Sequence, residues 1–166
     1  MNTKTLSTEV LVFLVTLRKY QQRVALARKM SGEPPHLWNG YRSVVKGEET
    51  FERAAARTLA EQAGIHIEQA RLQRFAVAEY GVGKNRPFRI THVFLCRHWN
   101  GKPQKTTDMG HPSWFLFEEI PTKEVAPGTD ILLQRILIGE KLRIKFVLND
   151  KQAVVDYYHD ETVSNL

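Results

Sequence analysis

Residues 43–65 read SVVKGEETFERAAARTLAEQAGI, and this stretch decides the fold. From 50 to 63 it consists mainly of Ala, Leu, Arg, Glu and Gln, which favour helix. Its apolar residues at 51, 54, 55, 59 and 63 recur at helical spacing. Thr50 is a candidate N-cap, and Gly64 follows where a helix C-terminus favours glycine. The stretch therefore predicts an amphipathic helix that follows a loop.

The flanking segments predict strands. Residues 8–19 (TEVLVFLVTLRK) are rich in β-branched and aliphatic types, and residues 22–29 suit a hairpin partner. Ser31 to Pro35 is a loop signal. Further strands are expected at 71–81, 89–97, 113–119, 141–148 and 152–158, and a second helix at 130–139. Such elements predict an α/β fold with a mixed β-sheet sandwiched between helices.

The bulk properties indicate one soluble domain over residues 1–166. The single cysteine excludes an internal disulfide and favours a reducing, cytoplasmic location. Residues 10–17 form an apolar run that is too short to span a bilayer, so a buried strand is expected and no membrane partner.

The net charge of +6 suits anionic ligands such as phosphates and nucleotides, although it also serves solubility. The charges are scattered without a block of five or six, so nucleic acid is the least favoured partner.

The stretch 43–65 resembles the Nudix box, G-x5-E-x7-R-E-U-x-E-E-x-G-U, where U is aliphatic. Without gaps, the matching residues are Glu49, Arg57, Leu59, Glu61, Gly64 and Ile65. Three positions depart from the box, because Ser43, Thr58 and Gln62 replace a glycine and two glutamates. The alternative is an ordinary amphipathic helix in which Arg57 and Glu61 form a surface pair four residues apart.

The rest of the chain resembles the MutT-like branch of this family, which includes oxidised-purine nucleoside triphosphatases. The resemblance spans about residues 8–163 and rests on WNG at 38–40, HVF at 92–94, TDM at 107–109, WF at 114–115, IP at 120–121 and VVDY at 154–157. It implies a Nudix fold and a pyrophosphohydrolase that acts on nucleotides or other nucleoside diphosphate-linked molecules.

The resemblance also implies a site for Mg²⁺ or Mn²⁺, since diphosphate cleavage uses divalent cations held by hard oxygen ligands. Glu61 would be the catalytic metal ligand, and Asp108, otherwise a solvated turn residue, would be a second ligand from outside the box. Glu49 and Arg57 would form its scaffold. Residues 58, 61 and 62 share one helix face, so the neutral Thr58 and Gln62 leave a metal site that is impaired or lost.

Substrate recognition is implied less completely. Asn39 matches an asparagine that reads the purine edge, although a turn residue before Gly40 is an equal alternative. Lys29 is a candidate for phosphate binding. Arg42 stands where the family has a glycine, and its side chain is either a substitute cation or simply solvated.

An aromatic residue and two aspartates of the branch are replaced by Ala126, Gly128 and Thr129, and a further aromatic by Glu33, so specificity for oxidised purines is not implied. Two functions remain open. One is a weak Nudix-type hydrolase, and the other is an inactive domain that binds a nucleotide or a protein partner.

Overall fold

The computed structural model describes residues 5–32, 36–159 and 166. Position 33 and the rest of the expected loop at 33–35 lie outside the described residues. The elements in chain order are β1 (Ser7–Arg18), β2 (Gln21–Arg28), β3 (Trp38–Asn39), β4 (Tyr41–Val44), α1 (Phe51–Ala63), η1 (Gln69–Arg71), β5 (Leu72–Val82), β6 (Arg89–Cys96), β7 (Ser113–Phe115), η2 (Phe117–Glu119), α2 (Thr129–Ile136), β8 (Leu142–Leu148) and β9 (Val154–His159).

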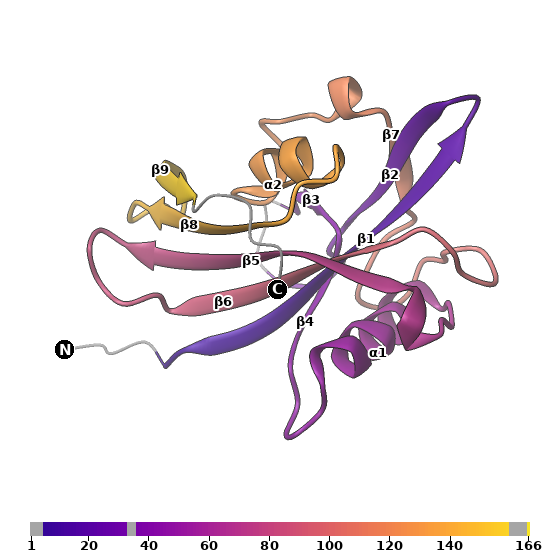
Figure 1. The fold of residues 1–166 in the computed structure, drawn as a ribbon, viewed down its shortest axis with the longest axis horizontal. Helices are drawn as coiled ribbons and strands as arrows, with labels where there is room; N and C mark the ends of the chain where they lie inside the picture. The colour runs from indigo at the N-terminus through magenta and orange to yellow at the C-terminus, as the bar shows by residue number, and fades with distance from the viewer. Residues whose placement is uncertain (1–4, 33–35, 160–165) are drawn as a thin grey trace.

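The strands form a mixed sheet with the order β3-β2-β1-β6-β5-β8-β9, as Figure 1 shows. The pairs β1·β6 and β5·β8 are parallel, and the other pairs are antiparallel. Strand β4 pairs with β1, and β7 pairs with β2. The long strand β1 therefore lies between β4 and β6 at its beginning and next to β2 at its end.

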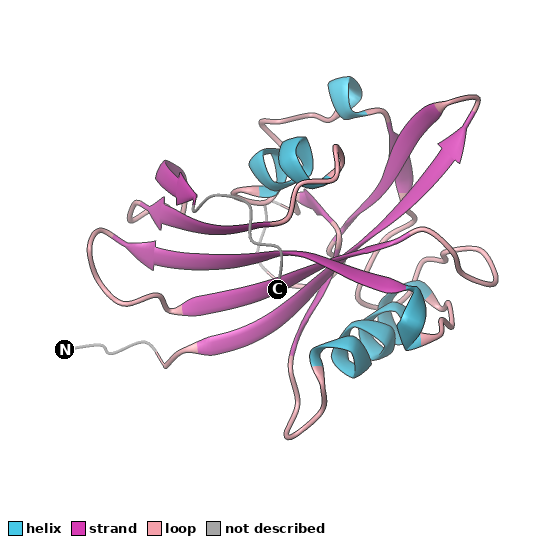
Figure 2. Ribbon diagram, in the orientation of Figure 1, coloured by secondary structure: helices cyan, strands magenta, loops and turns pink. Residues whose placement is uncertain are grey.

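The two faces of the sheet carry separate hydrophobic cores, because successive side chains of a strand point to opposite faces. Leu11, Phe13 and Val15 of β1 belong to the core that α2 covers, and the intervening residues 10, 12 and 14 belong to the core that α1 covers. The helices lie on opposite sides of the strands (Figure 2). The predicted sheet between helices is thus confirmed.

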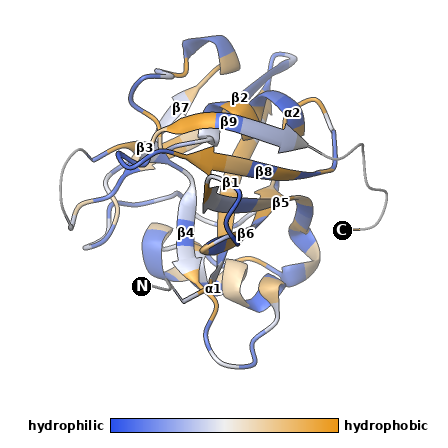
Figure 3. Ribbon diagram, turned by 90° about the vertical axis from the view of Figure 1, so that its left-hand side faces the viewer, coloured by the Kyte–Doolittle hydropathy of each residue, from blue (hydrophilic) through white to orange (hydrophobic). Residues whose placement is uncertain are grey.

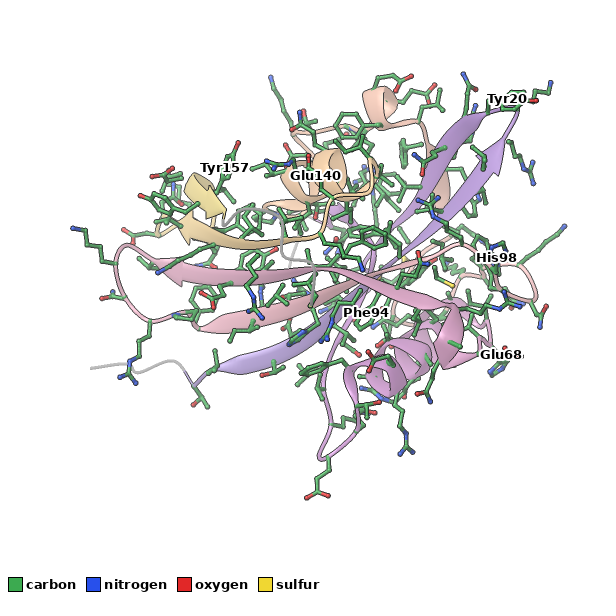
Figure 4. All side chains as sticks on the ribbon, in the orientation of Figure 1. Tyr20, Glu68, Phe94, His98, Glu140 and Tyr157 are labelled. Atoms are coloured by element: carbon green, nitrogen blue, oxygen red, sulfur yellow. The ribbon has the colours of Figure 1, made fainter. Side chains whose placement is uncertain are left out.

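Burial follows this layering. Phe94 of β6 is fully buried and lies beside α1, whereas Tyr20 at the tip of the β1–β2 hairpin is 99% exposed (Figure 4). Hydrophobic residues follow the central strands, and most loops are hydrophilic (Figure 3). In the described part of the chain, no helix is both long and apolar enough to cross a membrane.

Helix α1 has the ends that its sequence predicts. The Thr50 hydroxyl accepts a hydrogen bond from the Arg53 backbone N–H at 3.1 Å, which caps the first turn. Gly64 adopts the left-handed conformation with φ of 66°, where glycine is favoured. These local contacts fix where the helix begins and ends.

The expected strand at 113–119 is only partly correct. Strand β7 ends at Phe115, and η2 follows it. The Glu119 carboxylate accepts a hydrogen bond from the Leu116 backbone N–H at 3.2 Å, and this contact closes the turn that ends the extended segment. The short strands β3 and β4 were not expected, because two to four residues carry no clear periodicity.

Candidate functional site

Glu49 and Arg57 fasten the loop before α1 to the helix. Arg57 donates from Nε to Glu49 Oε2 at 3.1 Å and from Nη2 to Glu49 Oε1 at 2.6 Å. The backbone N–H of Lys46 also donates to Glu49, at 2.7 Å. The Arg57 hydrogen bonds are the main reason that the pKa of the Glu49 carboxyl falls to about 2. This two-pronged contact holds the loop in one conformation.

Glu61 lies one turn further along α1 and is held by the same arginine. Arg57 Nη1 donates to Glu61 Oε2 at 3.2 Å, and the Glu61 side chain is 48% exposed. Arg57 and Glu61 therefore form an ion pair on the helix surface, and Arg57 contacts Glu49 at the same time. Arg57 bridges two carboxylates, so the expected scaffold and the expected surface pair are both present.

Thr58 is fully buried, so its side chain is not exposed to solvent, and it contacts β4. Its hydroxyl donates to the Ala54 carbonyl at 2.7 Å. The Ser43 hydroxyl lies within hydrogen-bond distance of the Thr58 hydroxyl, and it must be the donor because the Thr58 proton already goes to Ala54. The two residues that replace a glycine and a glutamate of the box thus bond to each other.

Gln62 makes a similar contact with the preceding residue of β4. Its Oε1 accepts from the Arg42 backbone N–H at 3.1 Å, and its Nε2 donates to the Arg42 carbonyl at 2.6 Å. An amide can do both, whereas an ionised carboxylate can only accept. Gln62 is therefore matched to the backbone of Arg42 in a way that glutamate is not.

The residues present do not fit the divalent cation that the box implies. Among the residues that the structure describes, no group of three or more His, Cys, Asp or Glu side chains is placed to hold a metal ion. The side chains at 58 and 62 are neutral and bonded to β4. Mg²⁺ favours carboxylate and water oxygens, which these contacts do not provide.

A cavity of about 550 Å³ opens beside β4, within the size range of small-molecule sites. Its polar lining includes Lys29, Asn39, Arg42, Gln62, Asp108 and Thr129. Three of the site residues expected from the sequence, Lys29, Asn39 and Asp108, therefore line the same cavity. Glu61, Glu49 and Arg57 are not among the lining residues, so the cavity and the ion pairs of α1 are separate features.

The amide oxygen of Asn39 is already engaged. It accepts hydrogen bonds from the Gly40 backbone N–H at 2.8 Å and from the Thr129 hydroxyl at 3.1 Å. No hydrogen bond from the Asn39 side-chain nitrogen to another described residue is present, so this end supplies donors to the cavity it lines.

The loop before α2 is shaped by Gly128. A Cβ atom at this position would lie 2.9 Å from the Phe146 ring, and the backbone φ is 86°. A side chain such as the aspartate of the MutT-like branch therefore does not fit at Gly128. The neighbouring Thr129 is buried and bonded to Asn39, so the paired carboxylates of that branch have no counterpart at these two positions.

A buried charged cluster in the cavity wall was not expected from the sequence. Glu9 Oε2 lies 3.5 Å from Arg42 Nε and 3.9 Å from Arg89 Nε, and the Glu9 side chain is 13% exposed. The Arg89 guanidinium lies 4.0 Å from the centre of the Tyr80 ring. The available signal was a charged residue within the first three positions of each of two buried strands, β1 and β6.

Comparisons with known proteins agree with this architecture. The family model described as NUDIX domain matches residues 7–136. The oxidized purine nucleoside triphosphate hydrolase of Mus musculus is 29% identical over 157 residues, which cover 95% of each chain. The protein of the same name from Danio rerio is 26% identical over 84% of this chain and 87% of its own.

Two solved structures share the fold. The MutT protein from Bacillus halodurans superposes with a TM-score of 0.75 at 15% identity, over 93% of this chain and 98% of its own. The NUDIX domain of Shewanella oneidensis NrtR, in complex with ADP ribose, has a TM-score of 0.64 at 16% identity, over 79% and 86%.

Proposed function

Because the chain belongs to the Nudix family, we propose that it binds a nucleotide or another nucleoside diphosphate-linked molecule without a divalent metal and without efficient hydrolysis. The observation that carries this proposal is the contact between the Gln62 amide and the Arg42 backbone. A side chain that both donates and accepts at the backbone of one residue holds β4 against α1 and is not free to coordinate a cation.

Both side chains that replace glutamates of the box have hydrogen-bond partners on β4. Thr58 bonds to the Ser43 hydroxyl, and Gln62 bonds to the backbone of Arg42. Buried polar groups are costly when they are unpaired. Here neither replacement is left unpaired, which supports a domain that is stable without a metal.

The cavity supports a nucleotide as the ligand. It combines the cationic Lys29, Arg42 and Arg89 with the free amide donors of Asn39. A phosphorylated ligand needs positive charge, and a base needs directional donors and acceptors. Relatives point to the same ligand class, since one is named a nucleoside triphosphate hydrolase and one structural neighbour holds ADP ribose.

The test is calorimetric titration of the protein with ADP-ribose, ATP and an oxidised guanosine triphosphate, in EDTA and in MgCl₂. We expect at least one of these compounds to bind with similar affinity in both buffers. Binding that requires magnesium would contradict the proposal, and so would no binding in either buffer.

Weak hydrolysis is the second candidate function. It is favoured by the intact contact between Glu49 and Arg57 and by the exposure of Glu61, which the resemblance makes the catalytic residue. Phosphate release from the same compounds, with Mg²⁺ and with Mn²⁺, tests it. Turnover that disappears in Glu61→Gln would replace the first proposal with this one, whereas undiminished turnover in that variant would remove the assignment of Glu61.

A further inference from the structure

We propose that the guanidinium groups of Arg42 and Arg89 form a phosphate-binding subsite in the cavity wall, where fixed positive charge takes the place of a divalent cation. This inference rests on the proposed function and adds the group that the site recognises. Phosphate is matched well by guanidinium groups, which present several N–H donors in one plane.

Strand register brings the two arginines to one place. On β1, Ser7, Glu9 and Leu11 point to the same face of the sheet. Arg42 of β4 is paired with Leu11, and Arg89 of β6 is paired with Ser7. The two arginines thus approach Glu9 diagonally from opposite sides, and both lie near the same oxygen, Glu9 Oε2, at 3.5 and 3.9 Å.

The cluster holds more positive than negative charge. Three cationic side chains, Lys29, Arg42 and Arg89, line the cavity. The nearby carboxylates are those of Asp108, which also lines it, and of Glu9, which lies close to both arginines. The pKa of Arg89 is lowered, first by burial and then by the charge of Arg42, so the two guanidinium groups lie close enough to repel each other. An anion between them would relieve this repulsion.

Two polar atoms in the same wall lack hydrogen-bond partners among the described residues. Thr91 is directly paired with Glu9 across β1·β6 and is 2% exposed. Thr91 and Arg89 both line the cavity, and neither the Thr91 hydroxyl nor Arg89 Nε makes a hydrogen bond to the described residues. A buried polar group without a partner is costly, and phosphate oxygens would provide acceptors for both.

The surroundings also hold the two arginines in position. The Tyr80 ring lies under the Arg89 guanidinium, which orients its plane. Gln62 fixes the backbone of Arg42 by the two-way amide contact. Gln62 therefore holds the part of β4 that carries the Arg42 side chain.

The test uses inorganic pyrophosphate as the probe, titrated calorimetrically in EDTA at constant ionic strength. The main variant is Arg42→Gln, because Arg42 is 37% exposed and its loss leaves the core intact. We expect its affinity for pyrophosphate to fall about tenfold or more, since a charged hydrogen-bonding partner is lost. Arg53→Gln, on the exposed side of α1, is the matched control and should bind as the wild type does.

Glu9→Gln separates binding from a purely structural role. Removing the carboxylate that competes for both arginines should lower the melting temperature of the free protein and raise its affinity for pyrophosphate. If the cluster only stabilises the fold, the melting temperature falls and the affinity does not rise. Unchanged pyrophosphate affinity in Arg42→Gln would overturn the subsite, and malonate binding as tightly as pyrophosphate would overturn its assignment to phosphate.

Nucleotide titrations distinguish this failure from failure of the proposed function. If a nucleotide binds in EDTA equally well to the wild type and to Arg42→Gln, the subsite is wrong and the proposed function stands. If pyrophosphate binds through Arg42 and no nucleotide binds, the subsite stands and the nucleotide-binding function is wrong.

Discussion

The side-chain amide of Gln62 and the backbone of Arg42 form a two-way contact, with hydrogen bonds of 3.1 Å at the Arg42 N–H and 2.6 Å at its carbonyl. This contact occupies the helix face on which the Nudix box places its last glutamate. The same face carries Thr58, bonded to Ser43. The chain thus keeps the fold of the motif and replaces two of its acidic side chains with neutral contacts between α1 and β4.

Gln62→Glu should destabilise the protein, because a carboxylate cannot donate to the Arg42 carbonyl and would bring two acceptor oxygens together. We expect the free energy of unfolding to fall by about 1–3 kcal/mol, measured by urea denaturation at neutral pH. Gln73→Glu makes the same chemical change at an exposed position of β5 and should have little effect. Equal stability of the two variants would mean that the amide contact contributes nothing.

Glu49 should make the protein sensitive to strong acid. Its pKa is about 2 in the folded state against 4.5 ordinarily, so its stabilising effect is full above pH 4.5 and is lost as the pH falls towards 2. Denaturation curves over this range should show a smaller loss of unfolding free energy in Glu49→Gln, which starts from a lower stability. A parallel decline in both proteins would contradict the assignment to Glu49.

His92 should affect the stability of the protein at a higher pH than Glu49 does. Its ring stacks on Phe51 of α1 with centroids 3.6 Å apart, and burial, followed by the charge of Arg74, lowers its pKa from 6.5 to about 4. The unfolded chain therefore binds a proton before the folded one does, so stability declines as the pH falls from 6.5 towards 4. His92→Gln should lack this part of the decline, and an identical profile would rule out His92 as its source.

Gly128→Ala should destabilise the protein more than a glycine substitution that only strains the backbone. Position 128 has φ of 86° and no room for a Cβ atom beside Phe146, whereas Gly139 has φ of 91° and open space. Gly139→Ala should cost about 1–2 kcal/mol from the left-handed conformation alone, and Gly128→Ala about 1–3 kcal/mol more from overlap with the ring. Thermal denaturation of both variants measures the difference, and equal melting temperatures would show that the Phe146 ring yields freely.

The sequence predicted what depends on neighbours along the chain. Helix α1, its Thr50 cap and its Gly64 terminus follow from side-chain spacing and backbone preference. The two-faced burial of β1 follows from alternation along a strand. The contact between Glu49 and Arg57 spans eight residues within a single motif, so the match to the box was enough to expect it.

The residues of the cavity depend on distant segments. Asn39 and Thr129 are 90 positions apart, and Arg42 and Gln62 are 20 positions apart. The cluster of Glu9, Arg42 and Arg89 joins three strands, and the parallel register of β1 and β6 decides that it forms. The residue pattern of a single strand does not specify its register with a distant strand. A shift of one residue in that register would move these side chains to the other face of the sheet.

The sequence by itself therefore determined the family, the layers of the fold and the loss of two acidic residues from the box. Only the tertiary structure decided what replaced them, since hydrogen bonds between α1 and β4, and charges shared by β1, β4 and β6, exist only once these elements have packed together.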